Sequence, residues 1–328
     1  MIRLGIIGTN WITDRFLDAA LQTKQYTVGA VYSRTTEKAK AFAEKYDCDV
    51  TYTDMEGFSQ SKAFDAVYIA SPTALHAEQA IMCLQGKKHV LVEKPMASNQ
   101  REVQAMIEAA KTNNVTLMEA MKTTHVPNFE QLKEMFDAIA PIRRIVGNFC
   151  QYSSRYDRYK EGEILNAFKP DLSNGSLMDI GVYTIYPIVQ LFGAPKRVEA
   201  AAHMLASGVD GAGTVLLDYG DFQADLMFSK ITNSGLASEV QGENGSIVIK
   251  KWSDMLGLTL IDKEGNESDI SVDQRTNSMY YEADHFAALI KAGEIESNVN
   301  RFEVSLQTMD VLDTARAKIG LVFPSDKK

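Results

Sequence analysis

Short apolar runs alternate with helical patterns over the first 120 residues of the chain. Between the runs, apolar residues recur at helical spacing, as Val103, Met106, Ile107 and Ala110 do. Alternating strands and helices predict a parallel sheet covered on both faces by right-handed crossovers. The predicted strands are Ile2–Ile7, Val28–Tyr32, Asp49–Tyr52, Ala66–Ala70, His89–Val92 and Val115–Met118.

The helical period largely disappears beyond residue 195. Turn residues such as Gly242-Glu243-Asn244-Gly245 separate short strand-like runs, which predicts a mostly antiparallel sheet. Helices are expected over Asn128–Phe136, Tyr280–Ala292 and Phe302–Ile319. The strand candidates are Ile142–Ser153, Val198–Ala206, Gly213–Tyr219, Phe222–Phe228, Glu239–Gln241, Ser246–Lys250, Leu258–Ile261 and Ser268–Val272.

Two domains of different class are therefore expected. Residues 1–120 form an α/β unit, a Rossmann doubly wound parallel sheet that binds NAD(P). Residues 121–328 form an α+β domain for substrate binding and oligomerisation, with a mostly antiparallel sheet. The last helix is the element expected to pack back on the first domain.

Composition and charge exclude several classes of function. The net charge of −9 argues against a protein that binds the phosphate backbone of nucleic acid. No apolar run is long enough to cross a membrane, and the start of the chain is too soon interrupted for a signal peptide. The three cysteines form no close pair, and the five histidines lack metal-ligand spacing. We expect a cytoplasmic protein with no metal and no membrane partner.

The first strand-to-helix turn reads Gly8-Thr9-Asn10-Trp11-Ile12-Thr13. Dinucleotide-binding proteins place G-x-G-x-x-G/A at this position, so that the backbone can approach a pyrophosphate. Only Gly8 fits the pattern. Asn10 stands at the second glycine and is the non-glycine residue type that best tolerates the left-handed region, and Thr13 stands at the third. A simple strand-to-helix turn is the alternative reading.

The end of the second predicted strand indicates which cofactor is bound. NAD-binding proteins usually carry an acidic residue there, whereas a nearby arginine accommodates the 2′-phosphate of NADP. Ser33 and Arg34 occupy the position, and no acid does. The pattern favours NADP(H), although an arginine that stacks over adenine would also permit NAD(H).

Lys94 and Tyr183 are candidates for acid/base catalysis. Lys94 ends a buried run and precedes Pro95, which restricts its backbone to extended conformations. A phenol with a pKa of about 10 is a poor base, but a neighbouring ammonium lowers that pKa. Asp179 lies four residues before Tyr183, so on an α-helix the two share a face and Asp179 can bind a substrate hydroxyl. The alternatives are a packing aromatic at 183 and a helix cap at 179.

An ordered set of motifs resembles the Gfo/Idh/MocA oxidoreductases over essentially the whole chain. The set comprises Gly8, Ser71-Pro72-Thr73-Ala74-Leu75-His76, Glu93-Lys94-Pro95, Glu119-Ala120 with Pro127 beyond it, and Gly175–Tyr183. Tyr183, where many members carry histidine, resembles the branch of dimeric dihydrodiol dehydrogenase, glucose–fructose oxidoreductase and xylose dehydrogenase. The resemblance implies that Tyr183 is the acid/base, with Lys94 beside it.

The cofactor contacts that the resemblance and the turn imply are Gly8, Thr9, Asn10, Trp11, Ile12, Ser33, Arg34, Ala70, Ser71, Pro72, His76, Glu93 and Lys94. We expect an NAD(P)-dependent dehydrogenase or reductase that acts on a sugar, polyol or related small hydroxy or carbonyl compound. The degenerate turn also permits a non-catalytic dinucleotide sensor, and a few relatives suggest an NAD-dependent glycoside hydrolase. A homodimer or homotetramer formed through the C-terminal sheet is expected.

Overall fold

The computed structural model describes residues 1–327, and the chain divides into two compact units. Unit 1 comprises Met1–Lys122 and Arg275–Ser305. Unit 2 comprises Thr123–Gln274 and the residues from Leu306 onward. A functional boundary near residue 120 stays a prediction.

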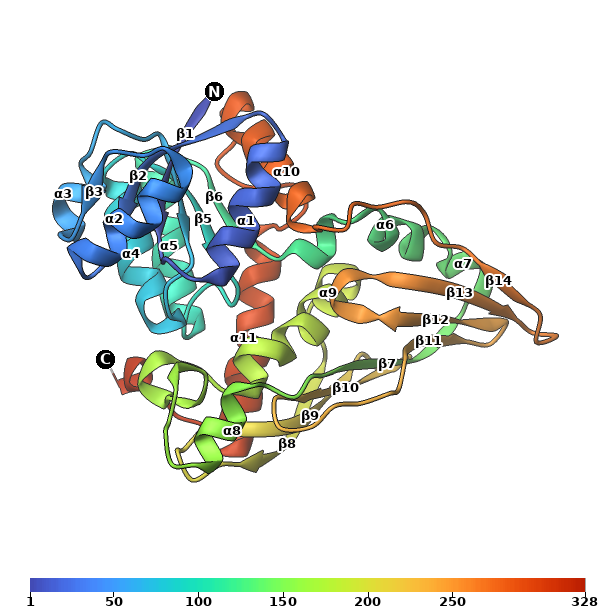
Figure 1. Cartoon of the computed structure of the whole chain (residues 1–328). Coiled ribbons are helices and arrows are strands. Elements are labelled where there is room, and N and C mark those ends of the chain that lie inside the picture. The colour runs from blue at the N-terminus through green and yellow to red at the C-terminus, as the bar shows by residue number, and fades with distance from the viewer. Residues whose placement is uncertain (328) are drawn as a thin grey trace. The chain divides into compact units, whose positions relative to one another are not determined.

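Unit 1 contains the predicted parallel sheet, in the strand order β3-β2-β1-β4-β5-β6 (Figure 1). All five strand pairs are parallel, which confirms the doubly wound α/β class. The strands are β1 (Ile2–Ile7), β2 (Tyr26–Tyr32), β3 (Thr51–Tyr52), β4 (Ala66–Ile69), β5 (His89–Glu93) and β6 (Leu117–Ala120). The helices are α1 (Trp11–Gln22), α2 (Thr36–Ala43), α3 (Met55–Ser59), α4 (His76–Gln85), α5 (Gln100–Asn113) and α10 (Met279–Ala292).

Helix α10 comes from the far end of the chain and lies beside α1 in unit 1 (Figure 1). Its apolar face is fully buried at Phe286 and joins the same core as Phe16. The hydroxyl of Tyr26 donates to the carbonyl of Ala283 over 2.6 Å, which fixes α10 to β2. The core of unit 1 is therefore closed by a helix that lies outside the βαβ series.

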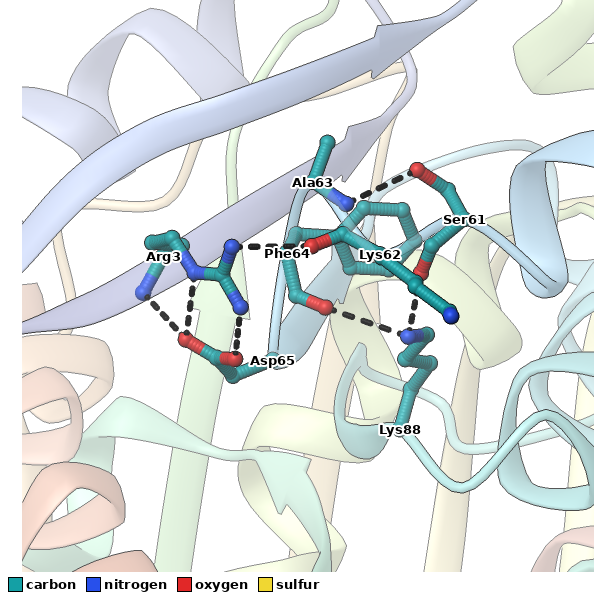
Figure 2. Close-up of polar contacts among 7 residues, drawn as sticks. All are labelled: Arg3, Ser61, Lys62, Ala63, Phe64, Asp65 and Lys88. Carbon is teal, nitrogen blue, oxygen red and sulfur yellow. Dashed lines mark hydrogen bonds and ion pairs between the residues drawn. The ribbon is translucent and has the colours of Figure 1, made fainter.

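The amino-terminal edge of the sheet is braced by charged side chains that bind backbone carbonyls (Figure 2). Arg3 in β1 pairs with Asp65 before β4 and also donates to the carbonyl of Lys62. Lys88, which precedes β5 and is 9% exposed, donates to the carbonyls of Ser61 and Phe64. These contacts lie at the opposite end of the strands from Gly8, so they stabilise the sheet without occupying its ligand-binding edge.

Unit 2 contains an eight-stranded sheet in the order β14-β13-β12-β11-β7-β10-β9-β8. The pair of β7 and β10 is parallel and the other pairs are antiparallel, so the prediction of a mostly antiparallel sheet is confirmed. Helix α9 packs on β7 and β10 (Figure 1). The strands are β7 (Ile142–Cys150), β8 (Arg197–Met204), β9 (Asp210–Asp218), β10 (Gln223–Ser229), β11 (Ser238–Gly242), β12 (Gly245–Lys251), β13 (Leu256–Asp262) and β14 (Glu267–Asp269).

The remaining helices are α6 (Pro127–Glu134), α7 (Phe136–Ile139), α8 (Arg155–Lys160), α9 (Val182–Phe192) and α11 (Phe302–Ile319). Helices α6 and α11 agree with the sequence analysis, which gave no bounds for α7 or α9. Helix α8 was not expected from the sequence, because six residues are too few for a helical period to be recognised. Within residues 1–327, no helix is both long and apolar enough to span a membrane.

Candidate active site

The first turn of unit 1 requires glycine at position 8. Gly8 has a φ of +102°, and a Cβ atom there would lie 2.5 Å from the carbonyl oxygen of Ala70. Gly8 follows β1 and Ala70 follows β4, and these neighbouring strands flank the point where the strand order reverses. Ligands of open α/β sheets bind outside the carboxyl ends of the strands at such a point, so the backbone here fits a dinucleotide.

Asn10 does not adopt the left-handed conformation that the sequence analysis assigned to it. Its φ of −118° is extended, and its side chain caps α1 by accepting from the amides of Ile12 and Thr13. The Asn10 amide also donates to the carbonyl of Ala70 over 2.9 Å. The prediction was wrong because Asn favours helix caps as well as the left-handed region, and here the cap is used. The residue ties the β1 and β4 loops together.

The other residues of the predicted turn are Thr9, Trp11, Ile12 and Thr13. Thr13 is fully buried and donates its hydroxyl to the carbonyl of Gly8 over 2.8 Å, while Thr9 and Ile12 are half-buried. Trp11 begins α1 with 62% of its surface exposed. An indole placed at the edge of a nucleotide-type turn is a suitable fluorescent reporter of binding.

The end of β2 presents Arg34 at the surface. Ser33 is half-buried, and its amide donates to the carbonyl of Tyr52 over 3.1 Å. The cap of the next helix is supplied by Thr35, whose hydroxyl accepts from the amide of Lys38. Thr35 is therefore the residue that caps α2. The side chain of Arg34 is exposed just after the end of β2, where the 2′-phosphate of NADP is expected to bind.

The imidazole ring of His76 holds the loop after β4 in place through contacts with backbone carbonyls. The imidazole is 1% exposed, with Nδ1 at 3.1 Å from the carbonyl of Pro95 and Nε2 at 2.9 Å from that of Ser71. Ser71 donates its hydroxyl to Gln79, and no side chain caps α4. His76 braces the loops after β4 and β5.

The burial of His76 predicts a loss of stability in acid. Desolvation lowers the pKa of His76 from 6.5 to about 4, so the unfolded state takes up this proton at a higher pH than the folded state. The stabilisation is present above pH 6.5 and is lost as the pH falls to about 4, which amounts to about 3 kcal/mol. Urea unfolding at pH 7, 5.5 and 4.5 should show a smaller pH dependence for His76→Gln than for the wild type. His203→Gln, at an exposed position, is the control, and equal slopes in all three proteins would contradict the assignment.

The predicted lysine, Lys94, directly follows a buried carboxyl group, that of Glu93. Glu93 is 8% exposed; its Oε1 accepts from the hydroxyl of Tyr68 over 2.6 Å, and its Oε2 accepts from the amide of Lys94 over 3.2 Å. Burial raises the pKa of Glu93, whereas the charge of Lys94 lowers it. Lys94 itself is half-buried at the carboxyl end of β5. A cation at this edge, within electrostatic range of a buried carboxyl group, is suited to a reacting oxygen.

Glu119, from the neighbouring strand β6, fixes the segment after Pro95. Its two oxygens accept from the amide of Met96 over 2.9 Å and from the hydroxyl of Ser305 over 2.6 Å. Burial raises the pKa of Glu119 to about 7. The Glu-Lys-Pro segment is thus held by hydrogen bonds on both sides of its proline.

In unit 2, Asp179 forms an ion pair with Lys230 that the sequence analysis did not identify. The Lys230 side chain is 4% exposed and that of Asp179 is 36% exposed, so the carboxylate lies at a surface with its counter-ion behind it. The Lys230 ammonium also lies 5.8 Å from the ring centre of Phe168. The signal for Lys230 was a lysine at the end of the apolar strand Phe222–Phe228, the feature that drew attention to Lys94.

Asp179 and Tyr183 are not on one regular α-helix, as the sequence analysis assumed. Residues Leu177–Gly181 form a π-helical turn, and the α-helix starts at Val182. Such wide turns inside helices are frequent at functional sites. Asp179 belongs to the π turn and Tyr183 to the first turn of α9. The alternative that Asp179 is an N-terminal helix cap is wrong, because Asp179 lies inside the π turn, whose N-cap residue is Ser176.

The backbone of Tyr183 is held by a tryptophan. Pro187 lies inside α9 and has no N–H to donate to the carbonyl of Tyr183. The indole Nε1 of Trp252, which is 2% exposed, donates to that carbonyl over 2.9 Å. The Tyr183 ring packs edge-on against Phe149, with ring centres 5.5 Å apart. Because Pro187 leaves the carbonyl of Tyr183 without its helical hydrogen bond, Trp252 can donate to that carbonyl. This contact fixes the backbone of the predicted acid/base residue.

The structure thus gathers the predicted residues into two groups. Gly8, Asn10 and Ala70 are linked in unit 1, where Glu93 and Lys94 also lie, and Asp179 and Tyr183 lie in unit 2. The pairing of Lys94 with Tyr183 stays a prediction. Among residues 1–327, no cluster of His, Cys, Asp and Glu has the arrangement of a metal site.

Comparison with protein families confirms the resemblance. Residues 2–121 match the oxidoreductase family Gfo/Idh/MocA with an NAD-binding Rossmann fold, and residues 129–248 match the Gfo/Idh/MocA C-terminal domain. The chain belongs to the Gfo/Idh/MocA oxidoreductases.

Relatives of known name support the same class over the full length. The chain is 51% identical to scyllo-inositol 2-dehydrogenase (NADP(+)) IolU of Bacillus subtilis (strain 168), covering 100% of both chains. It is 28% identical to trans-1,2-dihydrobenzene-1,2-diol dehydrogenase of Mus musculus, covering 100% of this chain and 99% of the other. The crystal structure of KijD10, a 3-ketoreductase from Actinomadura kijaniata in complex with NADP and TDP-benzene, superposes with a TM-score of 0.85 at 25% identity, covering 97% and 98% of the chains. The protein is an NAD(P)-dependent oxidoreductase that acts on hydroxyl or carbonyl groups.

Proposed function

We propose that the protein is an NADP(H)-preferring dehydrogenase of a cyclic polyol, of the type of scyllo-inositol or a related cyclitol. The proposal rests mainly on the position of Lys94. This lysine directly follows β5 and the buried Glu93, and it lies in the same unit as the Gly8 turn. The names of IolU and of the dihydrodiol dehydrogenases, which act on ring hydroxyls, support this substrate class.

Residues of unit 1 would hold the cofactor. The Gly8 turn admits close backbone approach for the pyrophosphate, and Ser33 and Arg34 would bind the 2′-phosphate. Ala70, Ser71 and Pro72 follow β4 at the same edge of the sheet, where the His76 ring braces the loop. A bound nicotinamide would supply the acceptor for the hydride, which is the hydrogen of the substrate C–H bond with its electron pair.

The hydroxyl proton of the substrate needs an acceptor on the protein. Tyr183 takes this proton in alcohol oxidation and returns it in carbonyl reduction. The ammonium of Lys94 stabilises the phenolate and the developing alkoxide. Asp179, whose carboxylate is oriented by Lys230, accepts a hydrogen bond from a neighbouring ring hydroxyl of the polyol.

The proposed function is tested by cofactor titration followed by a substrate screen. We expect NADPH to change the fluorescence of Trp11 and to bind at least about tenfold tighter than NADH, in line with one lost charged contact. Arg34→Leu should remove most of this preference, and the exposed control Arg301→Leu should not. A panel of inositols, other cyclitols, aldoses and dihydrodiols with NADP⁺ should then give NADPH absorbance.

Two outcomes of the screen would favour other functions. Tight cofactor binding without redox change on any substrate would support a dinucleotide sensor. Cleavage of a glycoside with bound cofactor that shows no net reduction would support a glycoside hydrolase.

A further inference from the structure

The segment that carries Asp179 is capped by a carboxylate from a different element of unit 2. Asp210, the first residue of β9, is 0% exposed, and its Oδ2 accepts from the amide of Leu177 over 2.7 Å. Leu177 begins the π turn that contains Asp179, and Ser176, at the N-cap position of this turn, makes no capping hydrogen bond with its own side chain. The cap is therefore supplied by a residue 33 positions further along the chain.

The backbone before this turn requires glycine at position 175, because it passes close to the same carboxylate. Gly175 has a φ of +138°, and a Cβ atom there would overlap Oδ1 of Asp210. The carbonyl of Gly175 accepts from the amide of Asp179 over 3.2 Å. The glycine that opens the motif Gly175–Tyr183 thus makes room for Asp210 and also starts the turn on which Asp179 lies.

Strand β9 also holds the partner of Asp179. Gly211 follows Asp210, and its carbonyl accepts from the amide of Lys230 over 2.9 Å. The ammonium of Lys230 forms the ion pair with Asp179. Residues 210 and 211 therefore contact both members of this pair. The side chain of Asp210 holds the turn that carries the carboxylate, and the backbone of Gly211 holds the residue that carries the cation.

The buried carboxylate of Asp210 is an energetically costly way to cap a turn. Within residues 1–327 its Oδ1 has no hydrogen-bond partner. Burial raises the pKa of Asp210 to about 6, although the charge of Lys230 lowers it. A carboxylate accepts a stronger hydrogen bond than a neutral cap does, so it holds the turn more firmly. The arrangement favours precise placement of the turn over stability.

Tyr183 is held in place by a different contact. Its carbonyl accepts from the indole of Trp252 over 2.9 Å, and its ring packs against Phe149. Loss of the Asp210 carboxylate should therefore displace Asp179 more than Tyr183. Because the two residues have separate supports, one experiment can distinguish an effect on substrate binding from an effect on the chemical step.

We propose that Asp210 is a positioning residue for substrate binding: it caps the turn that carries Asp179 and places that carboxylate beside Lys230, where it accepts a hydrogen bond from a ring hydroxyl of the polyol. This inference rests on the proposed function, which assigns the hydroxyl contact to Asp179. Asp210 acts through the turn, so its removal should weaken the binding of substrate while proton transfer at Tyr183 continues.

The test compares the steady-state kinetics of Asp210→Ala, Asp210→Asn and Gly175→Ala at pH 8, where the Asp210 carboxyl is ionised. We expect Asp210→Ala to raise KM for the best cyclitol by about 10–100-fold and to change kcat by less than about threefold. Gly175→Ala should raise KM as well, because its Cβ displaces the same carboxylate. Asp210→Asn keeps an oxygen that can accept from the Leu177 amide, so KM should rise less.

Asp54→Ala is the matched control, because Asp54 caps α3 in unit 1 by accepting from the amide of Gly57 over 2.6 Å. This variant loses the same kind of contact and should keep the KM and kcat of the wild type. A wild-type KM in Asp210→Ala, or a fall in kcat without a rise in KM, would overturn the inference.

A double variant tests whether Asp210 acts through Asp179. Once Asp179→Asn has weakened the hydroxyl contact, adding Asp210→Ala should change KM by less than about twofold, as for residues that act as a unit. A further increase of about tenfold in the double variant would show that Asp210 acts by another route, against the inference.

A second readout needs no turnover. Hydrogen exchange of the Leu177 amide, followed by mass spectrometry of overlapping peptides from residues 174–183, should be at least about tenfold faster in Asp210→Ala than in the wild type. In Asp210→Asn it should stay nearer to the wild-type rate. Unchanged exchange in Asp210→Ala overturns the inference even if the enzyme is active. Faster exchange in a protein whose wild type oxidises no cyclitol rejects the proposed function, while the turn that carries Asp179 still depends on Asp210.

Discussion

Tyr183→Phe should lower kcat at neutral pH by about 10²–10⁴-fold, because the hydroxyl proton of the substrate loses its acceptor. The affinity for NADPH should stay within about twofold, since Tyr183 is not among the residues proposed to bind the pyrophosphate and the 2′-phosphate. Initial rates with the best cyclitol and a parallel NADPH titration measure both quantities. Tyr219→Phe is the matched control: its hydroxyl donates to the carbonyl of Gly193 and has a structural role, so kcat should not fall.

Lys94→Ala should also lower kcat. If the ammonium acts by stabilising the phenolate of Tyr183, removing both groups should cost little more than removing one, as for residues that act as a unit. Additive losses in the double variant Lys94→Ala/Tyr183→Phe would show that the two groups act separately. Unchanged kcat in both single variants would remove the mechanism.

Lys230→Met should lower kcat/KM by about 10–100-fold, chiefly through a higher KM, because Asp179 loses the cation that orients its carboxylate. Methionine keeps the volume of the buried stem, so the core of unit 2 stays filled. Removing one partner of this pair should also lower the free energy of unfolding by about 1–3 kcal/mol, reduced by the partial exposure of Asp179.

Steady-state rates at saturating NADP⁺ and urea unfolding of the same preparation separate the two effects. Lys133→Met is the control, since Lys133 pairs with Glu130 at the surface with both side chains 61% exposed. It should change neither quantity, as exposed ion pairs contribute little. A Lys230→Met enzyme with wild-type KM would show that Asp179 does not need its partner to bind substrate.

The sequence alone determined the fold class and the catalytic candidates. The run Ala66–Ile69 is buried at every position, as its uninterrupted apolar character required, and such runs between helical patterns leave a parallel sheet as the compatible arrangement. Gly8 was identified from its place after the first strand, and its positive φ and the close approach of Ala70 are local consequences of that turn.

Only the tertiary structure decided which distant side chains meet. Lys230 is 51 positions from Asp179 and directly follows β10, whose register is fixed by pairing with β7 and β9. The sequence predicted a helix over Tyr280–Ala292, but not that this helix would join unit 1 and bury Phe286 in the same core as Phe16. Periodicity records burial along one element, whereas ion pairs and buried carboxyl clusters depend on which elements pack together, and that choice is made by the free energy of the whole fold.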